Sequence, residues 1–170
     1  MPRSFDLSAE YQDSVEEVLQ AFTDEAYWLA RLAASGVDDA KLELLEPGDN
    51  GALEVVTLQI VHSDKLPGMI SQLHRGDLCI RREESWGPVT DGTASSTFSG
   101  SVAGAPAKVS GTATLFPAAE SGGSRLECQL TVHVRIPLIG GKLEKIIGTE
   151  LANLVSAEQQ FTSEWIISHG

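Results

Sequence analysis

The sequence predicts an α+β protein in which a seven-stranded curved antiparallel sheet wraps on one long C-terminal helix, with two short helices after the first strand. Two observations predict this fold class. Segments that alternate apolar and polar residues recur along the middle of the chain, as is typical of half-buried strands. An uninterrupted amphipathic stretch follows at residues 141–167. At 1.5 Å per residue it would span about 40 Å, which is enough to cross the whole sheet.

The expected elements follow from local signals. Residues 4–11 alternate strictly and predict the first strand. Asp13 or Ser14 is placed to cap the first helix and Thr23 or Asp24 the second, because their side-chain oxygens can accept from first-turn N–H groups. Further strands are expected at 41–46, 53–62, 78–86, 93–102, 107–116 and 125–136. Short Gly- and Pro-rich turns between most of them predict a meander, in which consecutive strands pair.

Two other segments have a helical spacing of apolar residues. Residues 66–76 open with Pro67-Gly68 and predict a short helix or a loop lid. In the C-terminal stretch, large apolar residues recur at three- and four-residue steps. They are Leu143, Ile147, Leu151, Leu154, Phe161 and Trp165. The chain of 170 residues is expected to form one domain, 1–170.

Charge and composition narrow the classes of partner. The net charge of -12 disfavours nucleic acid and anionic lipid headgroups, and the Lys and Arg residues are scattered along the sequence. No apolar run approaches the roughly 18 residues of a membrane span, and no signal-peptide pattern opens the chain. We therefore expect an acidic cytoplasmic protein, a monomer or weak dimer, with no integral membrane association. Cys79 and Cys128 are expected to be small buried hydrophobes rather than a disulfide.

The order strand, two helices, six strands, long helix is that of the helix-grip fold and resembles the START-like superfamily. That superfamily includes the birch-pollen-allergen-like proteins and the polyketide cyclase/dehydrase families. Residues 3–5, the strand end at Trp86 and residues 136–144 resemble an actinobacterial family of unknown function within it. The resemblance implies a cavity between sheet and helix that holds lipids, sterols, hormones or polyketides. A minority of members are enzymes and some are protein-binding modules.

The residues themselves give a partial indication of a cavity. One face of the two central strands is mostly small, with Ala94 and Gly100 on the first and Gly111 and Ala113 on the second. Small residues opposite a helix rich in large ones either bring the helix close or leave a void. An empty void is costly, so a void favours a ligand. The alternative is that the glycines mark bends in a curved sheet.

Few polar residues are candidates for a site. In the strand 78–86, either Arg82 and Glu84 point inward together with Trp86, or Arg81 and Glu83 do, and the alternation leaves both possibilities open. An inward charge has to be paired or has to meet a ligand group. An edge-proximal strand open to solvent is the alternative.

Two further candidates lie on other elements. His62 shares a strand face with Val56, Leu58 and Ile60, so it is either a cavity residue or a core-edge histidine. Glu158 continues the stripe of the last helix, toward the cavity or at the stripe border. The sequence contains no metal-ligand spacing, no Gly-x-Ser-x-Gly string and no phosphate-binding loop, so neither metal nor cofactor is expected.

These patterns favour the binding of a hydrophobic or amphipathic small molecule (lipid, sterol-like or polyketide-like) under the C-terminal helix. One alternative is a polyketide cyclase/dehydrase-type enzyme with His62 or Glu158 as general base and Arg82 or Arg81 orienting a carbonyl. The other is a protein-interaction module with a filled core. The residues expected to line the cavity are His62, Arg82, Glu84, Trp86, Ala94, Phe98, Val109, Ala113, Leu130, Val132, Leu154, Glu158 and Phe161.

Overall fold

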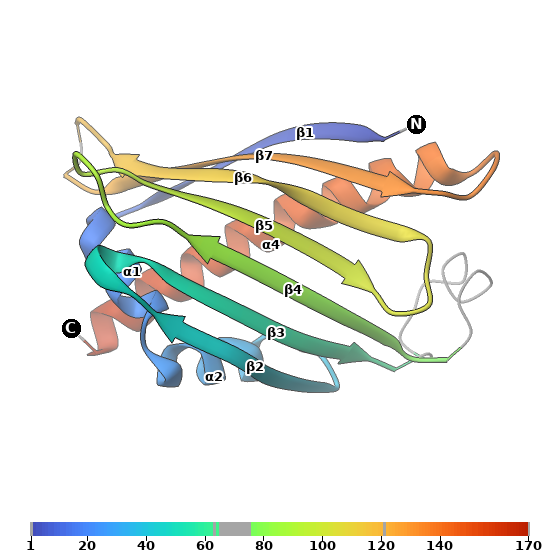
Figure 1. The fold of residues 1–170 in the computed structure, drawn as a ribbon, viewed down its shortest axis with the longest axis horizontal. Helices are drawn as coiled ribbons and strands as arrows, with labels where there is room; N and C mark the ends of the chain where they lie inside the picture. The colour runs from blue at the N-terminus through green and yellow to red at the C-terminus, as the bar shows by residue number, and fades with distance from the viewer. Residues whose placement is uncertain (1, 63, 65–75, 121, 170) are drawn as a thin grey trace.

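Seven antiparallel strands form one curved sheet in the computed structural model, which describes residues 2–62, 64, 76–120 and 122–169 (Figure 1). Their order in the sheet is β1-β7-β6-β5-β4-β3-β2. The strands are β1 (Arg3–Tyr11), β2 (Asp39–Pro47), β3 (Leu53–Val61), β4 (Leu78–Trp86), β5 (Ala94–Val102), β6 (Ala107–Pro117) and β7 (Ser124–Val134). Strands β2 to β7 form the expected meander, and the first strand closes the sheet beside the last. The helix-grip architecture is thereby confirmed.

Within the described residues, three α-helices accompany the sheet: α1 (Val15–Phe22), α2 (Glu25–Ala34) and α4 (Gly140–His169). Ser14 caps α1 through a capping box with Glu17, and the Asp24 side chain accepts a 2.9 Å bond from the N–H of Ala26 in α2. Both helix starts fall at predicted caps. A short 3-10 turn, η1 (Asp49–Gly51), joins β2 to β3. The lid expected at 66–76 lies almost wholly outside the described residues. None of the described helices combines the length and apolar composition that a bilayer crossing requires.

The last strand ends at Val134, two residues before the predicted boundary. Instead of continuing a ladder, the N–H of Val134 donates a 2.9 Å hydrogen bond to the buried carboxylate of Glu144 in the first turns of α4. The connecting turn contains Leu138, which has a φ of 73° and is fully exposed. A side-chain acceptor from the helix therefore closes the end of the strand.

The helix α4 crosses the concave face of the sheet from end to end (Figure 1). Its first half packs on β1 and β7, and Leu143 contributes there to a core with Leu130 and Val132. Its second half meets the short helices, where the ring centroids of Phe161 and Trp165 each lie 5.8 Å from that of Tyr27. The main core fills this end of the molecule, between the short helices and the sheet, and we call it the closed end.

Candidate functional site

A cavity of about 420 Å³ lies between the sheet and α4. At its inner end it is bordered by buried side chains from the closed end of the molecule, among them Phe22, Trp86 and Leu115. At its outer end it is bordered by Pro106, Ile136 and Ile146, which are partly exposed, Ile146 to 40%. We call these three residues the rim. The interior is predominantly apolar.

Most of the residues predicted for a cavity do border this one. They are Arg82, Glu84, Trp86, Phe98, Val109, Ala113, Leu130, Val132, Leu154 and Glu158. Three others lie elsewhere: Ala94 is fully buried in the main core, Phe161 packs beside it against Tyr27, and His62 is exposed. Bordering the cavity is a position in the fold, and a role in ligand binding for these residues stays a prediction.

The prediction that His62 could reach the cavity is wrong, because β3, which His62 directly follows, turns its other face toward the cavity. In the pairing of β3 with β4, Thr57 lies opposite the inward Arg82, so the face shared by Val56, Leu58 and His62 points away from α4. The backbone N–H of His62 donates a 2.6 Å bond to Asp38, and its side chain is 53% exposed. The inner face of β3 carries polar Thr57 and Gln59 instead, which reverses the apolar pattern read from the sequence.

The small-residue face is divided between the cavity and the packed sheet. Gly100 and Ala113 border the cavity. Gly111 does not, because a side chain there would come within 2.9 Å of the Phe98 ring, which covers it, and would collide with the backbone of β7. At Gly111 the alternative of a closely packed, curved sheet is therefore the better description.

The open question about β4 is resolved in favour of the face that carries Arg82, Glu84 and Trp86, all of which border the cavity. The neighbouring Arg81 instead forms a surface ion pair with Glu43 of β2.

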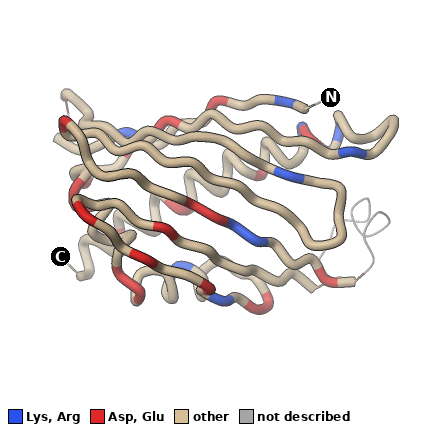
Figure 2. The backbone as a smooth tube through the Cα atoms, in the orientation of Figure 1, with Lys and Arg blue, Asp and Glu red and all other residues tan. Residues whose placement is uncertain are grey.

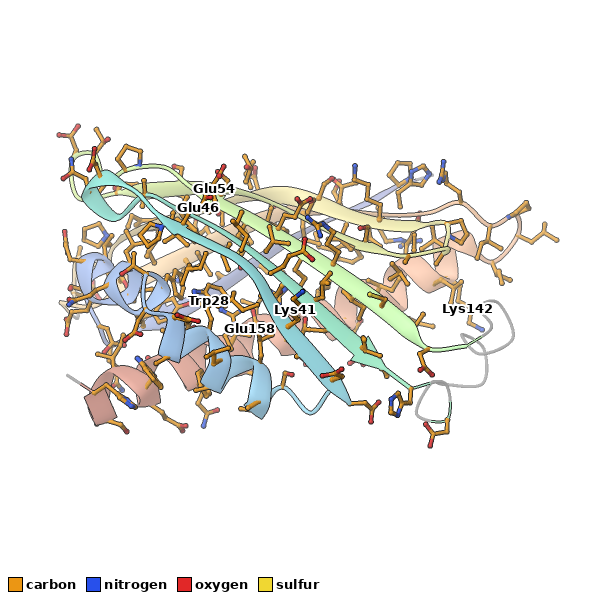
Figure 3. The ribbon with its side chains drawn as sticks, turned by 60° about the horizontal axis from the view of Figure 1, so that its bottom comes forward. Trp28, Lys41, Glu46, Glu54, Lys142 and Glu158 are labelled. Atoms are coloured by element: carbon orange, nitrogen blue, oxygen red, sulfur yellow. The ribbon has the colours of Figure 1, made fainter. Side chains whose placement is uncertain are left out.

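Glu158 of α4, labelled in Figure 3, is held by two arginines from two other elements. Arg82 of β4 binds its carboxylate through two N–H groups, at 2.7 Å and 3.2 Å, and Arg31 of α2 lies 2.6 Å from the same carboxylate. Glu84 borders the cavity beside them and interacts electrostatically with both arginines. We call Arg31, Arg82, Glu84 and Glu158 the polar cluster.

The position of Arg31 is itself fixed by neighbours in α2. Its guanidinium lies 4.7 Å from the centroid of the Trp28 ring and donates a 3.2 Å bond to the hydroxyl of Tyr27. That hydroxyl lies 2.6 Å from the Thr162 hydroxyl, which in turn donates to the backbone oxygen of Glu158. Arg31 was not predicted. The available signal was its place on the buried stripe of α2, four residues after Tyr27 and between Ala30 and Leu32.

Electrostatics keep Glu158 ionised in spite of its burial. Burial alone would raise the pKa of Glu158, but Arg31 and Arg82 outweigh it and lower that pKa to about 2. Burial opposes the charge of Arg31, and the Glu158 carboxylate more than compensates, so its pKa is raised. Burial also raises the pKa of Tyr11, whose hydroxyl stays protonated beside the cavity. The cluster thus carries two positive and two negative formal charges.

Other chemistry is sparse in the described part of the chain. It contains no group of three His, Cys, Asp or Glu residues placed to hold a metal ion. Cys79 and Cys128 are free thiols on separate strands. Cys128 borders the cavity, and burial raises its pKa to about 11, so its sulfur is a protonated, weakly reactive thiol.

Comparisons with known proteins agree with this architecture. The Mycobacterium tuberculosis H37Rv protein Rv0481c, itself uncharacterised, is 56% identical over 173 residues, and the alignment covers 99% of each chain. Among solved structures, TTHA0849 from Thermus thermophilus has a TM-score of 0.61 at 15% identity and covers 98% of each chain. Norcoclaurine synthase from Thalictrum flavum has a TM-score of 0.61 at 14% identity, covering 99% of this chain and 88% of its own. At such identities the solved structures establish the fold alone.

The family assignment rests on a match over nearly the whole sequence. Residues 6–166 match the family described as "Protein of unknown function (DUF2505)". The chain therefore belongs to this family, and it has the helix-grip fold that these solved structures share.

Proposed function

We propose that the protein binds an amphipathic small molecule, with the apolar part in the cavity and a polar group at the polar cluster. The observation that carries this proposal is an apolar cavity of about 420 Å³ with charged side chains converging on it from three elements. Ligand pockets in proteins typically have volumes of roughly 300–1,000 Å³, predominantly apolar walls and a few placed polar groups. The geometry fits that description.

The charge balance of the polar cluster favours an uncharged polar group on the ligand. Two guanidinium groups face two carboxylates, so a further anion or cation would meet its attraction and its repulsion together. A hydroxyl or carbonyl can use the guanidinium N–H groups that Glu158 leaves free, because each guanidinium has five donors. Glu84 supplies acceptors for a hydroxyl. A long-chain alcohol, a sterol-like molecule or a phenolic polyketide has this combination.

The enzyme alternative requires a general base. The two candidate bases considered from the sequence, Glu158 and His62, are poorly suited to accept a proton from a ligand in the cavity. Glu158 is held ionised by two arginines, and a carboxylate whose pKa is about 2 is a weak proton acceptor. His62 lies outside the cavity lining. The interaction-module alternative required a filled core, and the cavity argues against it. Norcoclaurine synthase has also been solved with dopamine and hydroxybenzaldehyde bound, which supports small phenolic molecules as first candidates.

The free thiols bear on the compartment in which this binding would take place. Cys79 and Cys128 are both unpaired, and Cys79 is only partly buried. Unpaired cysteines are usual where glutathione keeps thiols reduced. This supports the proposal that the protein acts in the cytoplasm.

The test is direct measurement of what the cavity holds. Native mass spectrometry of protein purified from its own host should detect a co-purified small molecule, and the neutral dye N-phenyl-1-naphthylamine should gain fluorescence on binding. Ala113→Leu, which places a larger side chain on the cavity wall, should reduce dye binding at least tenfold.

A matched control is Ala119→Leu, since Ala119 is exposed in the turn between β6 and β7 and is remote from the cavity lining. It should leave dye binding within twofold of that of the unmodified protein. The proposal is abandoned if neither a co-purified molecule nor dye binding is found, or if the two substitutions affect dye binding equally.

A further inference from the structure

The positive charges that look scattered in the sequence gather at one end of the folded molecule. In the described residues, Arg31 and Arg82 are paired with Glu158, while Arg81 and Arg125 form surface ion pairs. The other cations in these residues form no ion pair with another described residue. They are Arg3, Lys41, Lys108, Arg135, Lys142 and Lys145. All of them except Lys41 belong to the starts of β1, β6 and α4 or follow the end of β7.

Contacts show that these element ends meet. Lys108 of β6 lies opposite His133 of β7, and the backbone N–H of Arg135 donates a 2.8 Å bond to Pro106, the residue before β6. The guanidinium of Arg3 reaches Gly141 in the first turn of α4. Figure 2 shows the Lys and Arg colour at this end around the N-terminus, the β6 start and the α4 start. We call Arg3, Lys108, Arg135, Lys142 and Lys145 the basic end.

Little exposed negative charge offsets the basic end. The first carboxylate of α4, Glu144, is fully buried and accepts from Val134, so the first exposed acidic residue of that helix is Glu150. Asp6 of β1 is exposed three residues after Arg3. Other carboxylates toward this end of the sheet lie at the starts of β2 and β4 or after β3: Asp38, Asp39, Asp64 and Asp77. Those strands are separated from β7 by β5 and β6. The positive charge is therefore confined to the side formed by β6, β7, β1 and α4.

An apolar tip projects from the same place. Leu138 is fully exposed in the turn between β7 and α4 and has a φ of 73°, a conformation that residues other than Gly and Asn rarely adopt. The fold thus keeps a large apolar side chain in water on a strained backbone, three residues after Arg135 and four before Lys142. Ile136 and Ile146 of the cavity rim lie on either side of this turn in the chain. An exposed apolar tip, a basic surround and the cavity rim therefore coincide.

We infer that the basic end is a docking surface for an anionic phospholipid bilayer. The cations would lie among the headgroups, Leu138 would insert below them, and the rim would open toward the acyl chains. A nucleic acid would satisfy the cations but offers no apolar phase for Leu138. The inference revises the sequence-based expectation that the net charge disfavours anionic headgroups, because a local field acts within about a Debye length of the surface.

The test is co-sedimentation of the full chain with phosphatidylcholine vesicles that contain or lack phosphatidylglycerol. Binding should require phosphatidylglycerol and weaken with added salt. Each basic residue near an anionic surface contributes about fivefold in affinity, so Lys142→Glu, which changes the charge by two units, should lower vesicle binding by roughly twenty-fivefold. The matched control is Lys41→Glu on β2, an exposed lysine without a described ion pair and with the same charge change (Figure 3). It should change vesicle binding by less than twofold.

Two further variants separate the parts of the inference. Leu138→Asn removes the apolar tip with a residue that accepts the positive φ, so vesicle binding should fall while thermal stability is kept. Ala113→Leu alters the cavity and should leave vesicle binding unchanged, which makes docking testable whether or not a ligand is found. The inference is overturned if phosphatidylglycerol vesicles do not bind, if Lys41→Glu and Lys142→Glu weaken binding equally, or if duplex DNA binds as tightly in the same salt.

Discussion

The ring of Phe5 in β1 occupies the space that any side chain on Gly148 of α4 would need. A Cβ atom at Gly148 would fall inside the van der Waals envelope of that ring. The missing side chain lets the helix lie directly on the edge of the sheet. The distance of α4 from the central strands, and so the height of the cavity, depends on this contact.

Gly148→Ala should therefore destabilise the protein by about 1–3 kcal/mol, the usual cost of overpacking, although Ala is favoured over Gly in a helix by about 1 kcal/mol. Urea unfolding followed by circular dichroism measures the change. Gly141→Ala is the control, since its nearest neighbour is the flexible end of Arg3 at 3.7 Å, an ordinary contact. Its stability should stay within about 0.5 kcal/mol of the original. Equal effects of the two substitutions would contradict the close approach.

The adjacent arginines of β4 should differ sharply. Arg82→Gln leaves part of the Glu158 charge uncompensated in a largely buried site, and we expect a loss of about 3 kcal/mol in the free energy of unfolding. Arg81→Gln removes only surface ion pairs with Glu43 and Glu83 and should cost much less. The urea unfolding midpoints of the two variants measure this difference in stability. Similar losses of unfolding free energy in the two variants would mean that the inward orientation of Arg82 adds nothing to stability.

Acid should weaken the folded state through Glu158. Its pKa is about 2 in the folded state against an ordinary value of 4.5, so the stabilisation is fully present above pH 4.5 and is lost as pH falls toward 2. The difference of about 2.5 units corresponds to roughly 3 kcal/mol. Comparing unfolding free energies at pH 5 and pH 2.5 in the unmodified protein and in Glu158→Gln isolates this share. An equally steep pH dependence in both proteins would show that other carboxyl groups are responsible.

Local sequence patterns were sufficient to locate most of the secondary-structure elements. Alternation located the strands, and cap residues located the starts of α1 and α2, because both depend on neighbours along the chain. The sequence did not decide which face of β4 points inward, because the pairs Arg81/Glu83 and Arg82/Glu84 are chemically equivalent. Only the register with β3 separates them, and register is a property of the sheet.

The incorrect and missing predictions also concern features that depend on contacts between distant parts of the chain. His62 was placed inward because Val56, Leu58 and Ile60 form the more apolar face of β3, yet the opposite face points inward and its Gln59 borders the cavity. Arg31 was overlooked because an arginine in a short helix ordinarily faces solvent. The basic end could not be predicted, since its members come from β1, β6, β7 and α4 and become neighbours only in the folded chain.

Two alanines on neighbouring central strands should lose stability to different extents when they are enlarged. Ala113 borders the cavity, so Ala113→Leu should lower stability by less than about 1 kcal/mol while displacing the fluorescent dye. Ala94 is 1% exposed within the main core, and Ala94→Leu should cost about 1–3 kcal/mol. The sequence alone suggested that both would behave alike. Thermal unfolding of the two variants, with dye binding measured on each, decides whether the void is confined to the Ala113 side.

The polar cluster and the rim occupy different stretches of one helix. Glu158 follows Ile146 by twelve residues on α4, which corresponds to about 18 Å along the helix axis. A molecule that reaches the cluster through the rim therefore moves with its polar group leading, and that group sheds its water before it finds new partners. The rate of ligand exchange would then be limited by dehydration of the ligand's polar group rather than by the length of its apolar tail. Among ligands with the same tail, a neutral alcohol should enter faster than its carboxylate.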